Sequence, residues 1–293
     1  MNRSHSSVMA LAAIVASMAL AACERSSAPA PATPTPAAAP AAAATPAHAA
    51  NTPAGVALLE QELAYGETKN RNLVGFLAMP ADAVEPLPAL IVIHEWWGLN
   101  DEIKTVTRRL ASEGYVALAV DLFGGATAKT PAQAEKLMTD VFADPEAARA
   151  NLRQAYDYLD KYAFAPRIGS IGWSFGGGWS LEAVMQLPAQ LDAAVIYYGP
   201  LQTDAAKLRS IDVPILGLYG ALDETIPERD TIAFRALLVN QLHKNAKILI
   251  YPKAKHTFAS AGSGDYNAEA AAQAWNETLG FLGEHLKLKP AQP

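Results

Sequence analysis

Short apolar segments alternate with amphipathic ones along most of this chain. The apolar segments have the composition of strands, at Leu73–Ala78, Ala89–His94, Tyr115–Asp121, Ile168–Trp173, Ala193–Tyr198, Pro214–Tyr219 and Lys247–Tyr251. Helical periodicity falls between and after them, near Ile103–Ser112, Pro131–Phe142, Pro145–Tyr162, Gly177–Gln186, Glu228–His243 and Asn267–Lys287. The middle strands are apolar throughout, as in a sheet covered on both faces. The pattern predicts an α/β fold with a doubly wound, mostly parallel sheet flanked by helices.

The N-terminal end follows a different pattern. Val8–Leu20 is an apolar run too short for a membrane span, which needs about 20 residues, but it suits the core of a secretory signal. It ends in Leu20-Ala21-Ala22-Cys23, which resembles the lipobox of bacterial lipoproteins, and Cys23 is the only cysteine. The resemblance implies that residues 1–22 are removed as a signal peptide and that Cys23 carries lipid. The alternative is an ordinary cleaved signal with an incidental cysteine.

Residues 23–54 separate this signal from the rest of the chain. Ala28–Ala54 consists almost entirely of alanine, proline and threonine and has no acidic or basic side chain. Such a segment cannot build a core, so we expect a disordered tether that spans about 3.1 Å per residue where it is extended. Residues 55–293 then form one domain, held in the bacterial cell envelope by the lipid and most simply facing the periplasm.

Charge and cysteine content exclude several classes of function. There are 23 basic and 29 acidic side chains, a net charge of −6, so no basic excess is available to bind nucleic acid. A single cysteine excludes an internal disulfide and a zinc site built from several thiolates. We therefore expect no metal and no cofactor, a small-molecule substrate as partner, and contact with a membrane only through the lipid. The sequence does not predict the oligomeric state.

One motif carries nucleophilic chemistry. The strand Ile168–Trp173 leads into Gly172-Trp173-Ser174-Phe175-Gly176, a Gly-x-Ser-x-Gly pattern that is followed by a predicted helix. A serine on a sharp turn from strand to helix needs small neighbours, and the turn exposes its hydroxyl above the sheet. Ser174 is therefore the candidate nucleophile. The amide of Phe175, at the start of the helix, is a candidate donor to an oxyanion.

A serine nucleophile needs a base and a residue that orients the base. Of six histidines, only His256 lies in a loop after a late strand, whereas His94 precedes the serine at the end of an early strand. Asp223 follows the strand between Ser174 and His256, and the adjacent Glu224 has nearly the same spacing. The order Ser174, Asp223, His256 is that of α/β-hydrolases.

With these motifs the chain resembles the dienelactone hydrolase family, from about residue 74 to residue 282. The resemblance also rests on His94-Glu95-Trp96-Trp97-Gly98-Leu99-Asn100 and Asp121-Leu122-Phe123-Gly124-Gly125. It implies that Glu95 contacts the nucleophile and that Trp96 supplies the second oxyanion amide. Trp96, Trp97 and Trp173 could wall an apolar pocket.

Two departures from the family bear on the substrate. The founding member has cysteine where this chain has Ser174, so Glu95 need not keep its family role. That enzyme also grips its substrate carboxylate partly with arginine from the segment after Asp121-Leu122-Phe123, where this chain has Lys129 and Lys136 but no arginine. A neutral ester is then at least as suitable as an anionic lactone.

The sequence thus predicts a serine hydrolase that cleaves carboxylic esters or lactones through an acyl-enzyme. Two alternatives stay open: a peptidase or amidase of the same fold, and an envelope binding protein that keeps the scaffold without turnover.

Overall fold

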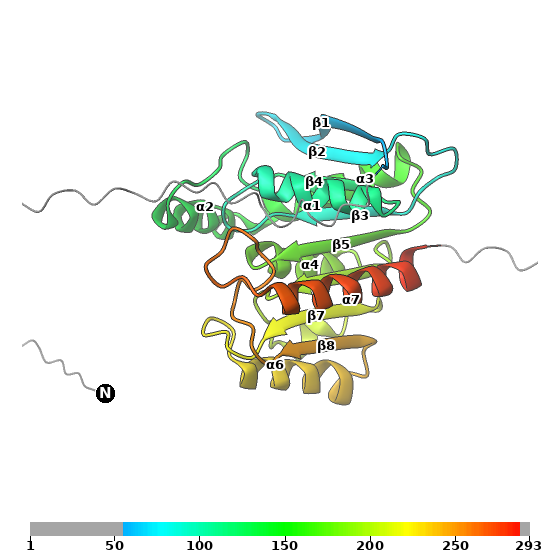
Figure 1. Cartoon of the computed structure of the whole chain (residues 1–293). Coiled ribbons are helices and arrows are strands. Elements are labelled where there is room, and N and C mark those ends of the chain that lie inside the picture. Colours follow the sequence, from blue (N-terminus) through cyan, green and yellow to red (C-terminus); the bar gives the residue numbers. More distant parts are fainter. Residues whose placement is uncertain (1–54, 288–293) are drawn as a thin grey trace, which may run out of the picture. The chain divides into compact units, whose positions relative to one another are not determined.

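The computed structural model describes residues 55–287. The predicted signal peptide, Cys23 and the whole of the predicted tether lie outside this range. Eight strands form one sheet in the order β1-β2-β4-β3-β5-β6-β7-β8 (Figure 1). Their bounds are β1 Leu58–Glu67, β2 Asn72–Pro80, β3 Ala89–Ile93, β4 Val116–Val120, β5 Ile168–Trp173, β6 Ala193–Tyr197, β7 Ile215–Gly220 and β8 Ala246–Tyr251.

The seven predicted strands are all present, with limits within one or two residues of those expected. From β4 to β8 neighbouring strands are parallel, whereas β1 pairs antiparallel with β2 and β2 with β4. Strand β1 is one that the sequence pattern does not indicate. It lies at the edge of the sheet, and Tyr65 is its only buried residue, so it has no continuous apolar face to recognise.

Helices follow most of the strands. Their bounds are α1 Asp101–Ser112, α2 Pro131–Ala143, α3 Pro145–Lys161, α4 Phe175–Gln186, α5 Ala205–Leu208, α6 Glu228–Arg235 and α7 Ala268–Leu286, with a π-helix, η2, at Ala236–Gln241. The helix expected over Glu228–His243 is therefore α6 continued by η2. His243 lies beyond it with φ of 53°, not on the helix.

Side-chain caps fix where five of these helices begin, namely α1, α2, α3, α5 and α7. The side chains of Asn100, Asp144 and Asn267 accept hydrogen bonds from backbone amides in the first turns of α1, α3 and α7. Such caps satisfy donors that have no partner within the helix and contribute about 1 kcal/mol each. Helices α1 and α7 thus start directly after loops at the carboxyl edge of the sheet, where the candidate site residues lie.

Helices cover both faces of the sheet, as the sequence predicts. Helices α1 and α7 lie over one face of the sheet (Figure 1) and their apolar side chains pack against it, whereas those of α3, α4 and α6 pack against the other face. The central strands β3, β4, β5, β6 and β7 are buried along their whole length. Burial on both sides leaves the strand ends and the loops after them as the accessible part of the sheet.

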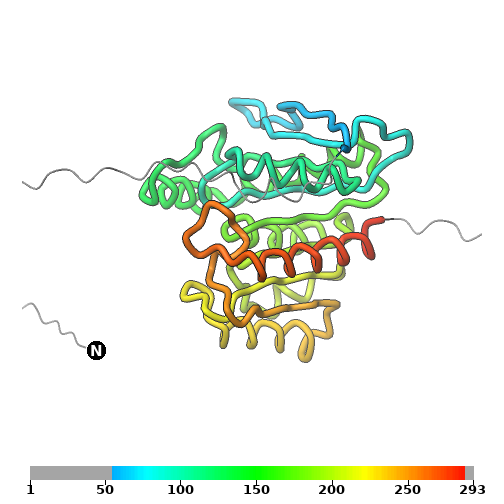
Figure 2. The backbone as a smooth tube through the Cα atoms, in the orientation of Figure 1, coloured from blue at the N-terminus to red at the C-terminus, as the bar shows by residue number. Residues whose placement is uncertain are grey.

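The loop after β8 brings a distant part of the chain to the middle of the sheet. Figure 2 shows this segment, in orange, leaving the edge strand and returning along the carboxyl edge before α7 begins. Ser260 in this loop donates a 2.8 Å hydrogen bond to Glu102 of α1, and the Asn267 amide donates to the Phe258 carbonyl. Within residues 55–287 no helix has the length and apolarity needed to cross a membrane.

Candidate active site

Ser174 lies on the turn between β5 and α4, in a backbone conformation that serine rarely adopts. Its φ is 49° and its ψ is −114°. The turn is closed by the Ser174 amide, which donates to the Tyr197 carbonyl over 2.9 Å, and by the Gly178 amide, which donates to the Ser174 carbonyl over 3.1 Å. The predicted strand–turn–helix context of the Gly-x-Ser-x-Gly motif is thus present.

The two glycines of the motif have no room for a side chain. A Cβ atom on Gly172 would lie 2.1 Å from the Gly176 carbonyl oxygen. A Cβ atom on Gly176 would lie 2.2 Å from the carbonyl oxygen of Ile93 and 2.5 Å from that of His94. The first turn of α4 is therefore pressed against the end of β3, which brings the segment that follows His94 close to the serine.

A chain of two hydrogen bonds links the predicted serine, base and carboxylate. The distance from Ser174 Oγ to His256 Nε2 is 2.9 Å, and the distance from His256 Nδ1 to Asp223 Oδ2 is 2.8 Å. These residues come from the turns after β5, β8 and β7, so the sheet brings together residues far apart in sequence. With Nδ1–H donating to the carboxylate, Nε2 is left free to accept the serine proton.

The structure distinguishes Asp223 from Glu224. Asp223 is buried, and its Oδ1 accepts hydrogen bonds from the amides of Thr225 and Ile226, both at 2.8 Å. These bonds turn Oδ2 toward His256. Glu224 is exposed and forms no hydrogen bond to His256 among the described residues. The carboxylate that faces the histidine is therefore that of Asp223.

Two backbone amides near Ser174 are free to donate. Phe175 is the first residue of α4, so its N–H has no acceptor within the helix. The amide of Trp96, in the loop after β3, also forms no hydrogen bond within residues 55–287. Both amides belong to segments that the close contact at Gly176 holds together. Phe175 and Trp96 therefore remain the candidate donors to an oxyanion.

Glu95 occupies a different environment from the one that the family resemblance implies. Its side chain is buried and accepts a 3.1 Å hydrogen bond from the Tyr198 hydroxyl, and none joins it to Ser174 in the described part of the chain. Burial, together with the nearby charge of Glu102, raises the pKa of Glu95 to about 7. The Tyr198 bond and the charge of His256 act in the opposite direction.

A cleft of about 490 Å³ adjoins these residues. Among the side chains that line it are Trp96, Trp97, Lys129, Glu95 and Glu102, and Thr257, the neighbour of His256, also contributes. Lys129 is the only cation among the described residues of its lining, which also contains two carboxyl groups. The cleft therefore offers no guanidinium pair for a substrate carboxylate.

A second, more apolar cleft of about 270 Å³ lies on the side of α4. Phe175, Trp179, Phe142 and Leu201 supply much of its lining. The prediction for Trp173 needs correction, because this side chain is a core residue. It is buried, its ring stacks on Tyr197 at 5.2 Å, and it lines only a cavity of about 10 Å³.

Tyr198 and His94 also lie near the site, and no role for either is predicted from the sequence. Tyr198 is fully buried with φ of 39°, and its ring lies 5.3 Å from that of His256. The pKa of Tyr198 is raised well above its usual value, mainly by burial and by Glu95. No sequence motif marks it, and its only signal is its place directly after a central strand.

The order of the sheet and the strained serine turn at the end of a central strand define an α/β-hydrolase fold. The profile of the dienelactone hydrolase family matches residues 73–286, and the chain belongs to this family.

Several known proteins are similar to this chain over most of its length. Protein usf of Aquifex pyrophilus is 33% identical over 209 residues, which cover 68% of this chain and 89% of that protein. A "putative carboxymethylenebutenolidase" of Saccharolobus solfataricus is 29% identical over 261 residues, or 76% of this chain and 98% of that protein. The crystal structure of a "putative dienelactone hydrolase" from Klebsiella pneumoniae has a TM-score of 0.71 at 27% identity, covering 78% and 100% of the two chains. These similarities agree with membership of the dienelactone hydrolase family.

Proposed function

We propose that this protein is a serine hydrolase that cleaves carboxylic esters or lactones through an acyl-enzyme. The observation that carries the proposal is the hydrogen-bonded chain from Ser174 through His256 to Asp223. The family is named for the hydrolysis of a lactone, and the relative from Saccharolobus solfataricus carries a name of the same kind. This hydrogen-bonded chain, together with the family's name, supports an ester or a lactone as the substrate.

The reaction follows from the positions of the three side chains. Ser174 Oγ attacks the acyl carbon while His256 Nε2 takes its proton, and Asp223 stabilises the imidazolium that forms. The amides of Phe175 and Trp96 donate to the oxyanion, each contributing about 3 kcal/mol to transition-state stabilisation. His256 then protonates the leaving alkoxide. A water molecule activated by His256 finally hydrolyses the ester bond between acyl group and Ser174.

The lining of the larger cleft supports a neutral substrate. Glu102 and Glu95, which is partly ionised at neutral pH because its pKa is about 7, disfavour an anionic group in this cleft. Lys129 alone does not form the bidentate contacts that arginine gives a carboxylate. We therefore propose neutral esters or lactones as the substrate class.

The test is covalent labelling of the full chain with a fluorophosphonate serine probe. Wild type, Ser174→Ala and His256→Ala are compared by mass spectrometry of their peptides, after circular dichroism has shown that each is folded. We expect one adduct, on Ser174 of the wild type, and none on either variant. A folded wild type that takes up no probe and hydrolyses no ester would refute the proposal in favour of a binding protein. Matched ester and amide substrates separate an esterase from an amidase.

We also propose that the chain is anchored to the bacterial cell envelope by lipid on Cys23, with residues 24–54 as a tether. Support comes from the sequence Leu20-Ala21-Ala22-Cys23 directly after the apolar run. Metabolic labelling with an alkyne fatty acid should mark the wild type and not Cys23→Ser. Equal labelling of the two proteins would exclude the anchor.

A further inference from the structure

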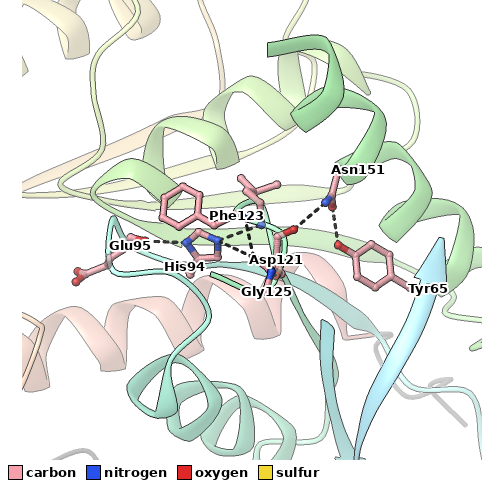
Figure 3. A network of polar contacts seen from close by, with 8 residues as sticks. Tyr65, His94, Glu95, Asp121, Phe123, Gly125 and Asn151 are labelled. Carbon is pink, nitrogen blue, oxygen red and sulfur yellow. Dashed lines mark hydrogen bonds and ion pairs between the residues drawn. The ribbon is translucent and has the colours of Figure 1, made fainter. Parts of the chain in front are cut away.

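His94 is a fully buried histidine that the proposed reaction does not use. It directly follows β3, and its ring lies between those of Phe123, 4.6 Å away, and Phe175, 5.9 Å away between centroids. Figure 3 shows the ring within a network of polar contacts that extends to Tyr65. An imidazole buried among aromatic rings has to satisfy both of its nitrogens within the protein.

The partners of the two nitrogens define a single protonation state. The Leu122 amide donates to His94 Nε2 over 3.1 Å, so Nε2 carries a lone pair and no proton. The remaining proton lies on Nδ1, which is 2.7 Å from the Glu95 carbonyl oxygen and donates to it. Burial lowers the pKa of His94, which favours the same neutral form.

Asp121 does not compete for this imidazole. Its Oδ1 atom is 3.9 Å from His94 Nε2, beyond hydrogen-bond distance. Its two carboxylate oxygens accept from the amides of Phe123 and Gly125, and its carbonyl accepts from Asn151 over 3.0 Å. These bonds of Asp121, which Figure 3 shows, fix the start of the loop in which the next residue, Leu122, donates to His94.

The carbonyl that His94 holds belongs to the same peptide unit as the Trp96 amide. A peptide unit is planar and trans, so its C=O and N–H point in opposite directions and cannot turn independently. Two hydrogen bonds to the carbonyl therefore set the direction of the Trp96 N–H: the Gly98 amide donates to it over 3.1 Å, and the shorter bond, of 2.7 Å, comes from His94. The same bonds polarise the peptide and make the N–H a stronger donor.

We propose that His94 is a positioning residue that aims the Trp96 amide at the oxyanion formed on Ser174. The inference rests on the proposed function and deepens it, because it names a side chain behind one of the two oxyanion donors. The glycine contact at the elbow supports it. Gly176 packs against the carbonyls of Ile93 and His94, so the two peptide units that directly precede the Glu95–Trp96 peptide lie beside the turn that carries Ser174.

Two variants separate this role from a merely structural one. In His94→Asn the side-chain amide places an N–H where Nδ1 lies, so the bond to the Glu95 carbonyl is kept. In His94→Gln the amide reaches the position of Nε2 instead, so the bond to the Glu95 carbonyl is lost. We expect His94→Gln to lower kcat for a neutral chromogenic ester about 10- to 100-fold with KM within twofold, since a misdirected oxyanion donor affects the transition state alone. His94→Asn should retain most of the activity. His285→Gln, the same change on α7, should leave kcat unchanged.

The inference is overturned if His94→Gln keeps the wild-type kcat, if both variants lose activity equally, or if the loss appears in KM. A His94→Gln protein that does not fold still leaves a direct measurement. Nitrogen-15 spectra of the wild-type histidines, assigned with His94→Asn, should show Nδ1 protonated and Nε2 unprotonated from pH 5 to pH 9. The opposite tautomer or an imidazolium would also overturn it. Absence of esterase activity in the wild type refutes the proposed function instead, and the spectra still test the His94 contacts.

Discussion

Two histidines lie near Ser174 in surroundings that give them opposite chemistry. His256 lies between the carboxylate of Asp223 and the hydroxyl of Ser174, and its side chain is partly exposed. His94 lies between a backbone carbonyl and a backbone amide and is fully buried. A carboxylate on Nδ1 stabilises the charged imidazolium, whereas a carbonyl and an amide stabilise one neutral tautomer. The first environment suits proton transfer, and the second suits a fixed structural hydrogen bond.

The largest loss of activity should come from removing the carboxylate beside His256, because this histidine then has only neutral partners, as His94 does. Asp223→Asn replaces the carboxylate by a neutral amide of the same shape, so the imidazolium loses its partner and the tautomer is no longer fixed. We expect kcat/KM for a neutral ester to fall about 10³- to 10⁴-fold. Glu224→Gln, one residue away and exposed, is the matched control and should stay within twofold. Similar losses in both variants would contradict the assignment of Asp223.

Glu95 interacts with both histidines. Its carbonyl accepts a hydrogen bond from His94, and its carboxyl group interacts electrostatically with His256. Its pKa is raised to about 7, so the folded protein binds this proton more tightly than the unfolded chain does. As pH rises from 4.5 to 7, wild-type stability should therefore fall relative to Glu95→Gln, by up to about 3 kcal/mol.

Urea unfolding of both proteins at pH 5 and pH 8 measures this effect. The gain in the free energy of unfolding from Glu95→Gln should be clearly larger at pH 8. Glu224→Gln again serves as the control and should give the same small difference at both values. A gain from Glu95→Gln that does not depend on pH would show that the folded protein holds this carboxyl no differently from the unfolded chain.

The smallest effect should arise at the far end of the His94 network. Tyr65→Phe removes the 2.7 Å hydrogen bond from the tyrosine hydroxyl to buried Asn151, at a cost of about 1–2 kcal/mol in the free energy of unfolding. Ester turnover should not change, because the Asn151 bond to the Asp121 carbonyl remains. Thermal unfolding and kcat of Tyr65→Phe are compared with those of Tyr162→Phe, whose ring is exposed. A lower kcat in Tyr65→Phe would contradict this prediction and show that the Tyr65 hydrogen bond also affects the geometry at Ser174.

The contrast between the histidines also explains why the sequence predicts the role of His256 but not that of His94. His256 and Asp223 are partners through side chains at strand ends, and the order of strands and the elbow motif place them near Ser174. The partners of His94 are backbone atoms of Glu95 and Leu122, which no side-chain pattern encodes. The choice between Asp223 and Glu224 was open for a related reason. Both follow the same strand, and only the local turn decides which carboxylate points toward His256.

The limits of the buried strands agree with the sequence prediction to within two residues, because a short, continuous apolar segment bounded by turn residues is typical of a buried strand. Strand β1 was missed because an edge strand with mostly exposed side chains has no such signal. The sequence also does not predict which tryptophans line a cleft. Composition alone could not separate Trp97, which lines the larger cleft, from Trp173, which is packed in the core, because burial depends on the tertiary structure.

The backbone of Ser174 has a consequence for how this protein can evolve. A positive φ at a residue other than glycine costs about 1–3 kcal/mol, which the surrounding turn has to supply. Glycine at this position would relieve the cost and remove the hydroxyl. Under the proposed function, thermal stability and ester turnover therefore favour different residues at position 174.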